Sequence, residues 1–215
     1  FDAAVATLAR ATRAEKLTPS VLSIIALQTG MIASARGNYA DALSWYERAD
    51  ALFAGHWLTA LYLAEARLAH GQARDAIAEL ERLARVQGRP EAMDMLALVW
   101  RVSGDSARSR EWAAQARSVW RARAARYPAA FAAHAAEHEL VFGDPKEALR
   151  LATLNTRARP YGEARLLLAR ALLAADQPRT AMAQITLAEQ SGWRSAQLFA
   201  LKAQALTILG KTDAA

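Results

Sequence analysis

Apolar side chains recur along the chain at the spacing of helices, with polar side chains between them. Near the N terminus, for example, Val5 and Leu8 lie three residues apart, which places both on one helix face. No segment alternates apolar and polar residues with period two, so we expect no β-strand. The pattern predicts helices over residues 1–16, 20–35, 39–53, 56–69, 73–87, 90–102, 106–126, 129–142, 145–157, 161–174, 178–190 and 194–209.

Short turns separate these helices at nearly constant intervals. The turns contain Gly37, Gly71, Gly104, Gly143, Asp176 and Gly210, so their spacings are 34, 33, 39, 33 and 34 residues. Glycine, and less readily aspartate, adopts the left-handed backbone conformation that ends a helix. A fixed period of this length is typical of repeat proteins, in which helix pairs stack on one another.

Small side chains recur in register with the turns. Seven residues before each turn stands a glycine or alanine, namely Gly30, Ala64, Ala97, Ala136, Ala169 and Ala203. After the first turn, Ala42 and Ala49 lie seven residues apart on the next helix, with Tyr46 between them in the sequence. We expect the small residues to let paired helices approach closely while large ones such as Tyr46 fill the remaining space.

These residues resemble the tetratricopeptide repeat, whose units carry a small residue on the first helix, a Gly-x-Tyr turn, two spaced alanines on the second helix and a closing proline. The stretch from Ser23 to Leu52 matches best, and Pro160 stands where a closing proline is expected. Ser109 and Asn155 depart from the pattern, because they replace alanines of the second helix. The resemblance covers nearly the whole chain.

The resemblance implies an all-α fold, a right-handed α-α superhelix of about five helix pairs with partial units at both ends. We expect a single array over residues 1–215. Its units are expected at 23–55, 57–89, 90–128, 129–161 and 162–195, and its partial units at 1–19 and 196–215.

The 39-residue interval predicts one extra helical turn before Pro128, a residue favoured at the start of a helix. Arginines and tryptophans alternate on this long helix, at Arg110, Trp112, Arg117, Trp120 and Arg121. Arginines and tryptophans arranged in this way can bind a phosphate backbone or an acidic protein. The alternative, which we favour, is that the tryptophans pack beneath a neighbouring helix and the arginines face solvent.

In the tetratricopeptide repeat family the first helix of each unit lines a concave surface. The resemblance places on this surface Ile24, Leu27, Gln28, Met31, Leu58, Leu61, Tyr62, Glu65, Asp94, Met95, Leu98, Arg101, His134, Glu137, Leu167 and Arg170. The N-terminal half of this set is mostly apolar, and exposed apolar patches usually mark interaction sites. A partner protein or peptide, in particular an apolar helix, is therefore the expected occupant, and a flanking segment of the same polypeptide is the alternative.

One subfamily clamps the terminal carboxylate of a peptide with lysine and asparagine at fixed positions of this surface. Leu27 and Met31 stand at the corresponding positions of the first unit. Neither side chain donates a strong hydrogen bond or carries a charge, so the sequence excludes this mode of binding.

The string His134-Ala135-Ala136-Glu137-His138 has the HxxEH spacing of some zinc peptidases. Two histidines four residues apart share a helix face, as zinc ligands must. However, Ala136 occupies a packing position of the repeat, and no third ligand can be placed. We therefore predict no catalytic residue, no metal site and no cofactor, and interpret the histidines as part of the concave surface.

Composition adds little about partners. The net charge is +6, and arginine supplies most of the basic charge, since lysine occurs only at positions 16, 146, 202 and 211. With so much alanine and arginine, the chain fits a GC-rich bacterial genome. Basic residues do not form blocks, so the charge does not favour nucleic acid as a partner.

Compartment stays open between bacterial cytoplasm and periplasm, because the chain has no cysteine to indicate a redox environment. The longest apolar runs, 21–27 and 166–175, are shorter than the roughly 18 residues of a membrane span. The chain starts at Phe1 and stops one helix short of a complete unit, so we expect it to be part of a larger protein.

The sequence as a whole predicts a non-catalytic scaffold that binds a protein or peptide. The alternative is a regulatory repeat region of a larger bacterial protein whose catalytic or DNA-binding domain lies outside these residues. A homodimer through the incomplete end units is also expected, since Leu198, Leu201 and Ile208 lack a covering helix in this scheme.

Overall fold

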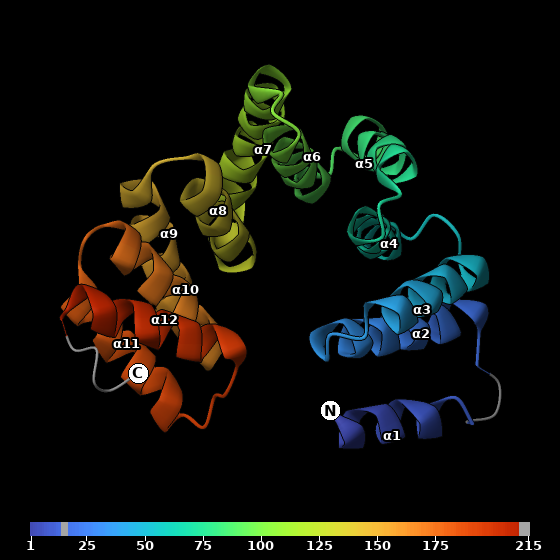
Figure 1. Ribbon diagram of the computed structural model, residues 1–215, viewed down its shortest axis with the longest axis horizontal. Helices are drawn as coiled ribbons and strands as arrows, with labels where there is room; N and C mark the ends of the chain where they lie inside the picture. The colour runs from blue at the N-terminus through green and yellow to red at the C-terminus, as the bar shows by residue number, and fades with distance from the viewer. Residues whose placement is uncertain (14–16, 211–215) are drawn as a thin grey trace. The chain divides into compact units, whose positions relative to one another are not determined.

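The computed structural model describes residues 1–13 and 17–210, and every regular element in these ranges is an α-helix (Figure 1). The helices are α1 (Asp2–Ala11), α2 (Pro19–Ala35), α3 (Tyr39–Leu52), α4 (Trp57–Ala69), α5 (Ala73–Gln87), α6 (Pro90–Val102), α7 (Ser106–Arg126), α8 (Pro128–Phe142), α9 (Pro145–Ala158), α10 (Gly162–Ala174), α11 (Pro178–Gln190) and α12 (Ala196–Ile208). The predicted helices are confirmed to within about two residues, except that α1 ends earlier than expected. Residues 14–16 and 211–215, parts of the predicted end units, lie outside the described residues.

Proline marks the start of several helices. Pro128 is the first residue of α8, as predicted, and α2, α6, α9 and α11 also begin at a proline. The first helical residue needs no N–H donor, and proline's fixed φ suits this position. The chain can therefore end one helix and begin the next within a few residues.

The chain divides into two compact units, Phe1–Ser109 (unit 1) and Arg110–Ala215 (unit 2), which are described separately. In unit 1, α2 packs with α3 and α4 with α5, and contacts of α3 with α4 and of α5 with α6 join them. In unit 2, α8 packs with α9 and α10 with α11, and α9 contacts α10 as α11 contacts α12 (Figure 1). Each unit is thus a stack of consecutive helix pairs, as expected of a helical solenoid.

The small residues predicted to permit close helix contacts do so. A Cβ added at Gly30 of α2 would lie 2.5 Å from Cε1 of Tyr46 on α3, so only glycine leaves room for this ring. The equivalent alanines Ala64, Ala97, Ala136 and Ala169 are completely buried, whereas Ala203 on α12 is half-buried. The repeat pattern therefore specifies packing inside both units.

The prediction for the turns is correct with one exception. Gly37, Gly71, Gly104, Asp176 and Gly210 have positive φ, as expected of residues that end a helix. The prediction is wrong for Gly143, whose φ is −126°. Here glycine is required for another reason, because a Cβ would overlap the carboxylate of Glu139 and lie 2.5 Å from Nη2 of Arg117.

Two departures from the alanine pattern are explained by hydrogen bonds. Ser109 is buried on α7, and its Oγ donates to the carbonyl oxygen of Ala97 at 2.8 Å. Asn155 is buried on α9, and its Oδ1 accepts from Nη2 of Arg159 at 3.2 Å. Both polar side chains are therefore satisfied in positions that alanine occupies elsewhere.

The predicted lack of cover over α12 is wrong for two of its three residues. Leu198 is completely buried and Leu201 is 7% exposed, because α12 packs against α10 and α11. Ile208 is half-exposed, as is Phe199 on the same helix. Dimerisation through this end of the chain stays a prediction.

Candidate partner-binding surface

The first helices of unit 1 carry most of the predicted surface residues. On α2, Ile24 is 51% exposed, Gln28 is exposed and Met31 is half-buried. Leu27 is corrected, because it is only 1% exposed and belongs to the hydrophobic core of unit 1. Its side chain faces the helices that pack on α2 and offers no surface to a partner.

Helix α4 carries the next set of predicted surface residues. Leu58, Leu61 and Tyr62 are half-buried and Glu65 is exposed. Leu58 and Tyr62, together with Met31 of α2, pack against the same buried cluster. The two helices therefore present partly exposed apolar side chains from a shared core.

Helix α6 adds a third row. Asp94 and Met95 are half-buried, Leu98 is 38% exposed and Arg101 is exposed. The starts of α4 and α6 are adjacent, since the guanidinium of Arg89 lies 4.1 Å from the ring centroid of Trp57. We call the partly exposed predicted residues of α2, α4 and α6 the first-helix surface. They are Ile24, Gln28, Met31, Leu58, Leu61, Tyr62, Glu65, Asp94, Met95, Leu98 and Arg101.

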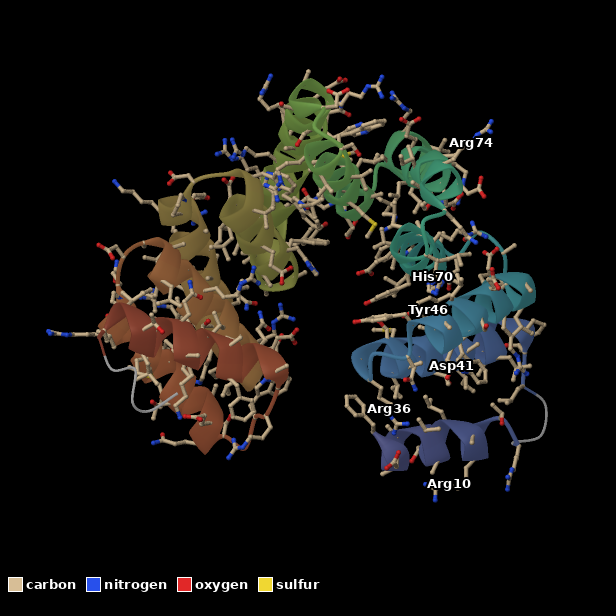
Figure 2. The ribbon with its side chains drawn as sticks, viewed as in Figure 1. Arg10, Arg36, Asp41, Tyr46, His70 and Arg74 are labelled. Atoms are coloured by element: carbon tan, nitrogen blue, oxygen red, sulfur yellow. The ribbon has the colours of Figure 1, made fainter. Side chains whose placement is uncertain are left out.

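A tyrosine pair lies next to this surface. The rings of Tyr46 on α3 and Tyr62 on α4 are stacked, with centroids 5.6 Å apart and planes inclined by 29°. Figure 2 shows Tyr46 at the side of α3 that faces α4. A hollow of about 70 Å³ opens beside the pair, with Glu65 in its wall. Sequence reasoning assigned Tyr46 only to packing, and the hollow was missed.

Burial raises the pKa values of Tyr46, Tyr62 and Glu65. Loss of hydration, with smaller contributions from Tyr62 and Glu65, raises the pKa of Tyr46 to about 12. The pKa of Tyr62 is raised by loss of hydration and by Glu65. The pKa of Glu65 is raised because its surroundings remove part of its hydration, although the side chain keeps solvent access.

The predicted surface residues of unit 2 also come together, but in a more polar setting. His134 and Glu137 on α8 are exposed, with Nδ1 and Oε2 3.6 Å apart, and Arg170 on α10 is half-buried. His134, Glu137 and Leu167 line a hollow of about 180 Å³. Leu167 is corrected in part, because it is 6% exposed and contributes little surface.

The two histidines of the HxxEH string have different environments. His134 is exposed and its ring stacks on Trp120, with centroids 5.4 Å apart. His138 is 2% exposed and its ring lies 5.5 Å from that of Phe142. Within residues 1–13 and 17–210 no group of three or more His, Cys, Asp or Glu side chains is arranged to hold a metal ion.

The arginines and tryptophans of α7 are mainly structural. Trp112 and Trp120 are buried, as in the interpretation that we favoured. Arg117 and Arg121 do not simply face solvent, since their Nη2 atoms lie 3.2 and 3.6 Å from the carboxylate of Glu139. These two arginines neutralise a buried carboxylate, which weakens the idea that they grip a phosphate backbone.

Glu139 was not singled out from the sequence, yet it connects three segments of unit 2. Its side chain is 2% exposed and accepts a hydrogen bond of 2.9 Å from the backbone N–H of Asp144. Arg117, which contacts the same carboxylate, also donates to the carbonyl oxygen of Phe142 at 3.0 Å. Helix α7, helix α8 and the turn before α9 are thereby fixed to one another.

Comparison with known protein families finds a match for part of the chain. Residues 33–101 match the tetratricopeptide repeat family. The match places tetratricopeptide repeats within residues 33–101. The matched residues include the tyrosine pair and most of the first-helix surface. A search of the curated proteins found no match to this chain.

Solved structures with tetratricopeptide repeats share the fold. A thermophilic protein of this type from Thermus thermophilus is 22% identical, with a TM-score of 0.66 over 86% of this chain and 99% of that one. A tetratricopeptide repeat protein from Parabacteroides merdae is 16% identical, with a TM-score of 0.57 over 97% of this chain and 80% of that one. A chain of the APC/C hetero-tetramer Cut9–Hcn1 is 16% identical, with a TM-score of 0.51 over 86% of this chain and 36% of that one.

Helix length and hydropathy decide whether a segment can span a membrane. Among the described residues, none of the helices is both long enough and apolar enough to cross a bilayer. The bacterial origin and the compartment stay predictions.

Proposed function

We propose that the chain is a non-catalytic scaffold whose first-helix surface binds an apolar helix of a partner protein. The main support is the row of half-buried apolar side chains on three successive first helices, represented by Met31, Leu58, Leu61 and Met95. A half-exposed side chain of this size contributes about 1 kcal/mol when a partner completes its burial. Several such side chains are enough to hold a helix in place once the cost of association is met.

The occupant is inferred from chemistry. The surface offers apolar side chains and not the unpaired backbone groups of a sheet edge. Such a surface favours binding of an amphipathic helix over addition of a β-strand. Methionines at positions 31 and 95 can adapt to the shape of the partner. Tetratricopeptide repeats support a role in binding other proteins, and the structurally similar Cut9–Hcn1 assembly is itself a hetero-tetramer.

Unit 2 is proposed to contribute polar contacts to the same kind of partner. His134, Glu137 and Arg170 carry hydrogen-bonding groups on its first helices. Exposed polar groups of this kind add specificity more than affinity. We assign them no catalytic role, because His134 is occupied in a stack with Trp120.

The proposal is tested with a synthetic amphipathic 18-residue helix carrying leucines on one face, labelled for fluorescence anisotropy. Leu61→Asp and Met95→Asp place a charge on the binding surface and are expected to weaken binding at least tenfold. Val86→Asp is the matched control, because Val86 is 76% exposed on α5, a second helix. Helical circular dichroism must be retained in all three variants.

Equal binding by all three variants, or no binding by the wild-type chain, contradicts the proposal. Where the gene encodes a flanking segment, binding of the peptide only after deletion of that segment would identify the segment as the natural occupant. This result favours the alternative in which the repeats regulate an attached domain.

A further inference from the structure

The hollow beside the tyrosine pair has the features of a specific binding subsite. Its lining residues come from α2, α3 and α4 of unit 1. They are Ser34, Tyr39, Ala42, Tyr46, Tyr62, Glu65, Ala66 and Ala69. Of these, Glu65 is the one side chain that is charged at neutral pH. The hollow therefore combines three tyrosine rings, those of Tyr39, Tyr46 and Tyr62, with one carboxylate.

The aromatic wall is held rigidly. Tyr46 is 3% exposed, and its ring fills the space left open by Gly30. Tyr62 stacks on it, with ring centroids 5.6 Å apart, and packs against the buried cluster of unit 1. A pocket wall that does not have to be ordered on binding lowers the entropic cost of association.

The carboxylate at the edge of the hollow is available to a ligand. Glu65 forms no hydrogen bond or ion pair with other residues in the described ranges, and it retains solvent access. Partial loss of hydration nevertheless raises its pKa, so the ionised form gains from a nearby positive charge. A bound cation supplies that charge, whereas a carboxylate or phosphate is repelled.

The size of the hollow limits the ligand further. The hollow, at about 70 Å³, is smaller than the hollow of about 180 Å³ in unit 2. A compact group such as an ammonium or the end of a guanidinium suits a hollow of this size. The faces of tyrosine rings attract cations of this kind.

We propose that this hollow binds a basic side chain, arginine or lysine, of the partner helix that lies on the first-helix surface. The inference rests on the proposed function, because the basic residue belongs to the same bound segment. The occupied subsite selects partners that carry a positive charge at one position among their apolar residues. The net charge of +6 does not prevent this, since charges beyond about 8 Å are largely screened at physiological salt.

The test uses a series of amphipathic peptides in which one arginine is placed in turn at each polar position. Each peptide is compared with a control peptide that carries citrulline at that position. Citrulline is neutral and has nearly the same shape as arginine. For one position or two adjacent positions, the wild-type chain is expected to bind the arginine peptide about tenfold more tightly. Elsewhere the two peptides should bind alike.

Variants locate the effect. Glu65→Gln should bring the arginine-to-citrulline ratio of affinities close to one, and Tyr62→Leu should reduce it. Glu47→Gln is the matched control, because Glu47 is exposed on α3, next to Tyr46 in sequence, but does not line the hollow. The arginine peptide should also lower the pKa of Glu65, measured by NMR of its carboxyl carbon, in the wild-type chain.

The outcomes separate this inference from the proposed function. Tight binding of the peptides with no arginine preference at any position overturns the subsite and leaves the first-helix surface intact. Failure of every peptide to bind overturns both. An arginine preference that persists in Glu65→Gln overturns the assignment of the subsite to this hollow.

Discussion

The carboxylate of Glu139 occupies the space that a Cβ at Gly143 would fill. The φ of −126° lies outside the left-handed region that favours glycine at the other turns. The overlap with Glu139 and Arg117 is therefore the main obstacle to a larger residue. Gly143→Ala is expected to lower the free energy of unfolding in urea by about 1–3 kcal/mol. In a Glu139→Ala background the cost of the same change should be smaller, and an equal loss in both backgrounds contradicts this explanation.

The Glu139 carboxylate itself should be important for the stability of unit 2. Glu139→Ala removes two arginine contacts and the hydrogen bond from the N–H of Asp144. We expect a loss of about 2–3 kcal/mol, less than for a wholly buried pair because the arginines keep solvent access. Glu147→Ala, which breaks the more exposed pair with Arg150, should cost about 0.5 kcal/mol or less in the same urea titration. Similar losses of unfolding free energy for Glu139→Ala and Glu147→Ala would contradict the idea that burial strengthens the Glu139 contacts.

The glycine at position 30 is predicted to be coupled to the ring that it faces. Gly30→Ala places a methyl group 2.5 Å from Tyr46 and is expected to cost about 1–3 kcal/mol of unfolding free energy. In a Tyr46→Leu background the cost should be smaller, since the side chain no longer fills that space. A double-mutant cycle in urea measures the difference. Additive effects of the two substitutions would contradict direct contact.

Ionisation of Tyr46 gives a prediction at high pH. Its pKa is raised from 10.0 to about 12, so the folded state keeps a proton that the unfolded state loses between these values. The contribution to stability is therefore fully present below pH 10 and is lost as the pH rises towards 12. It amounts to about 2–3 kcal/mol, since one pKa unit corresponds to about 1.4 kcal/mol.

Absorbance at 295 nm, which reports phenolate, checks this prediction without unfolding the chain. The wild-type titration should contain a late component, and Tyr46→Phe should reduce it, leaving the contribution of Tyr62, whose pKa is also raised. Tyr127→Phe is the control, because Tyr127 is 52% exposed in unit 2. Simultaneous titration of all the tyrosines near pH 10 would contradict the burial of Tyr46.

Much of the fold follows from local sequence signals. Helix ends coincide with prolines such as Pro128 and with glycines such as Gly104, because backbone conformation at these residues is decided by the residue type itself. Packing at Ala64 and Ala97 follows from the repeat, since small residues recur where helices meet. These features depend on single positions or on a fixed period, which a sequence displays directly.

The candidate surface was less predictable, because it depends on contacts between separate helices. Leu27 was assigned to it by position in the repeat, yet Ala26, Tyr46 and Leu63 enclose it in one buried cluster. The Tyr46 hollow depends on a stack between α3 and α4, and spacing within either helix does not show it. Glu139 looked like an ordinary charged residue, and only its approach to Arg117 and Gly143 explains its burial.

Hydrogen–deuterium exchange on the full chain, with and without a saturating amphipathic peptide, shows most directly where a partner lies. Binding to the first-helix surface predicts slower exchange in α2, α4 and α6, with little change in the second helices α3 and α5. Protection confined to α3 and α5, or no protection in unit 1 while the peptide is bound, would contradict the proposed function.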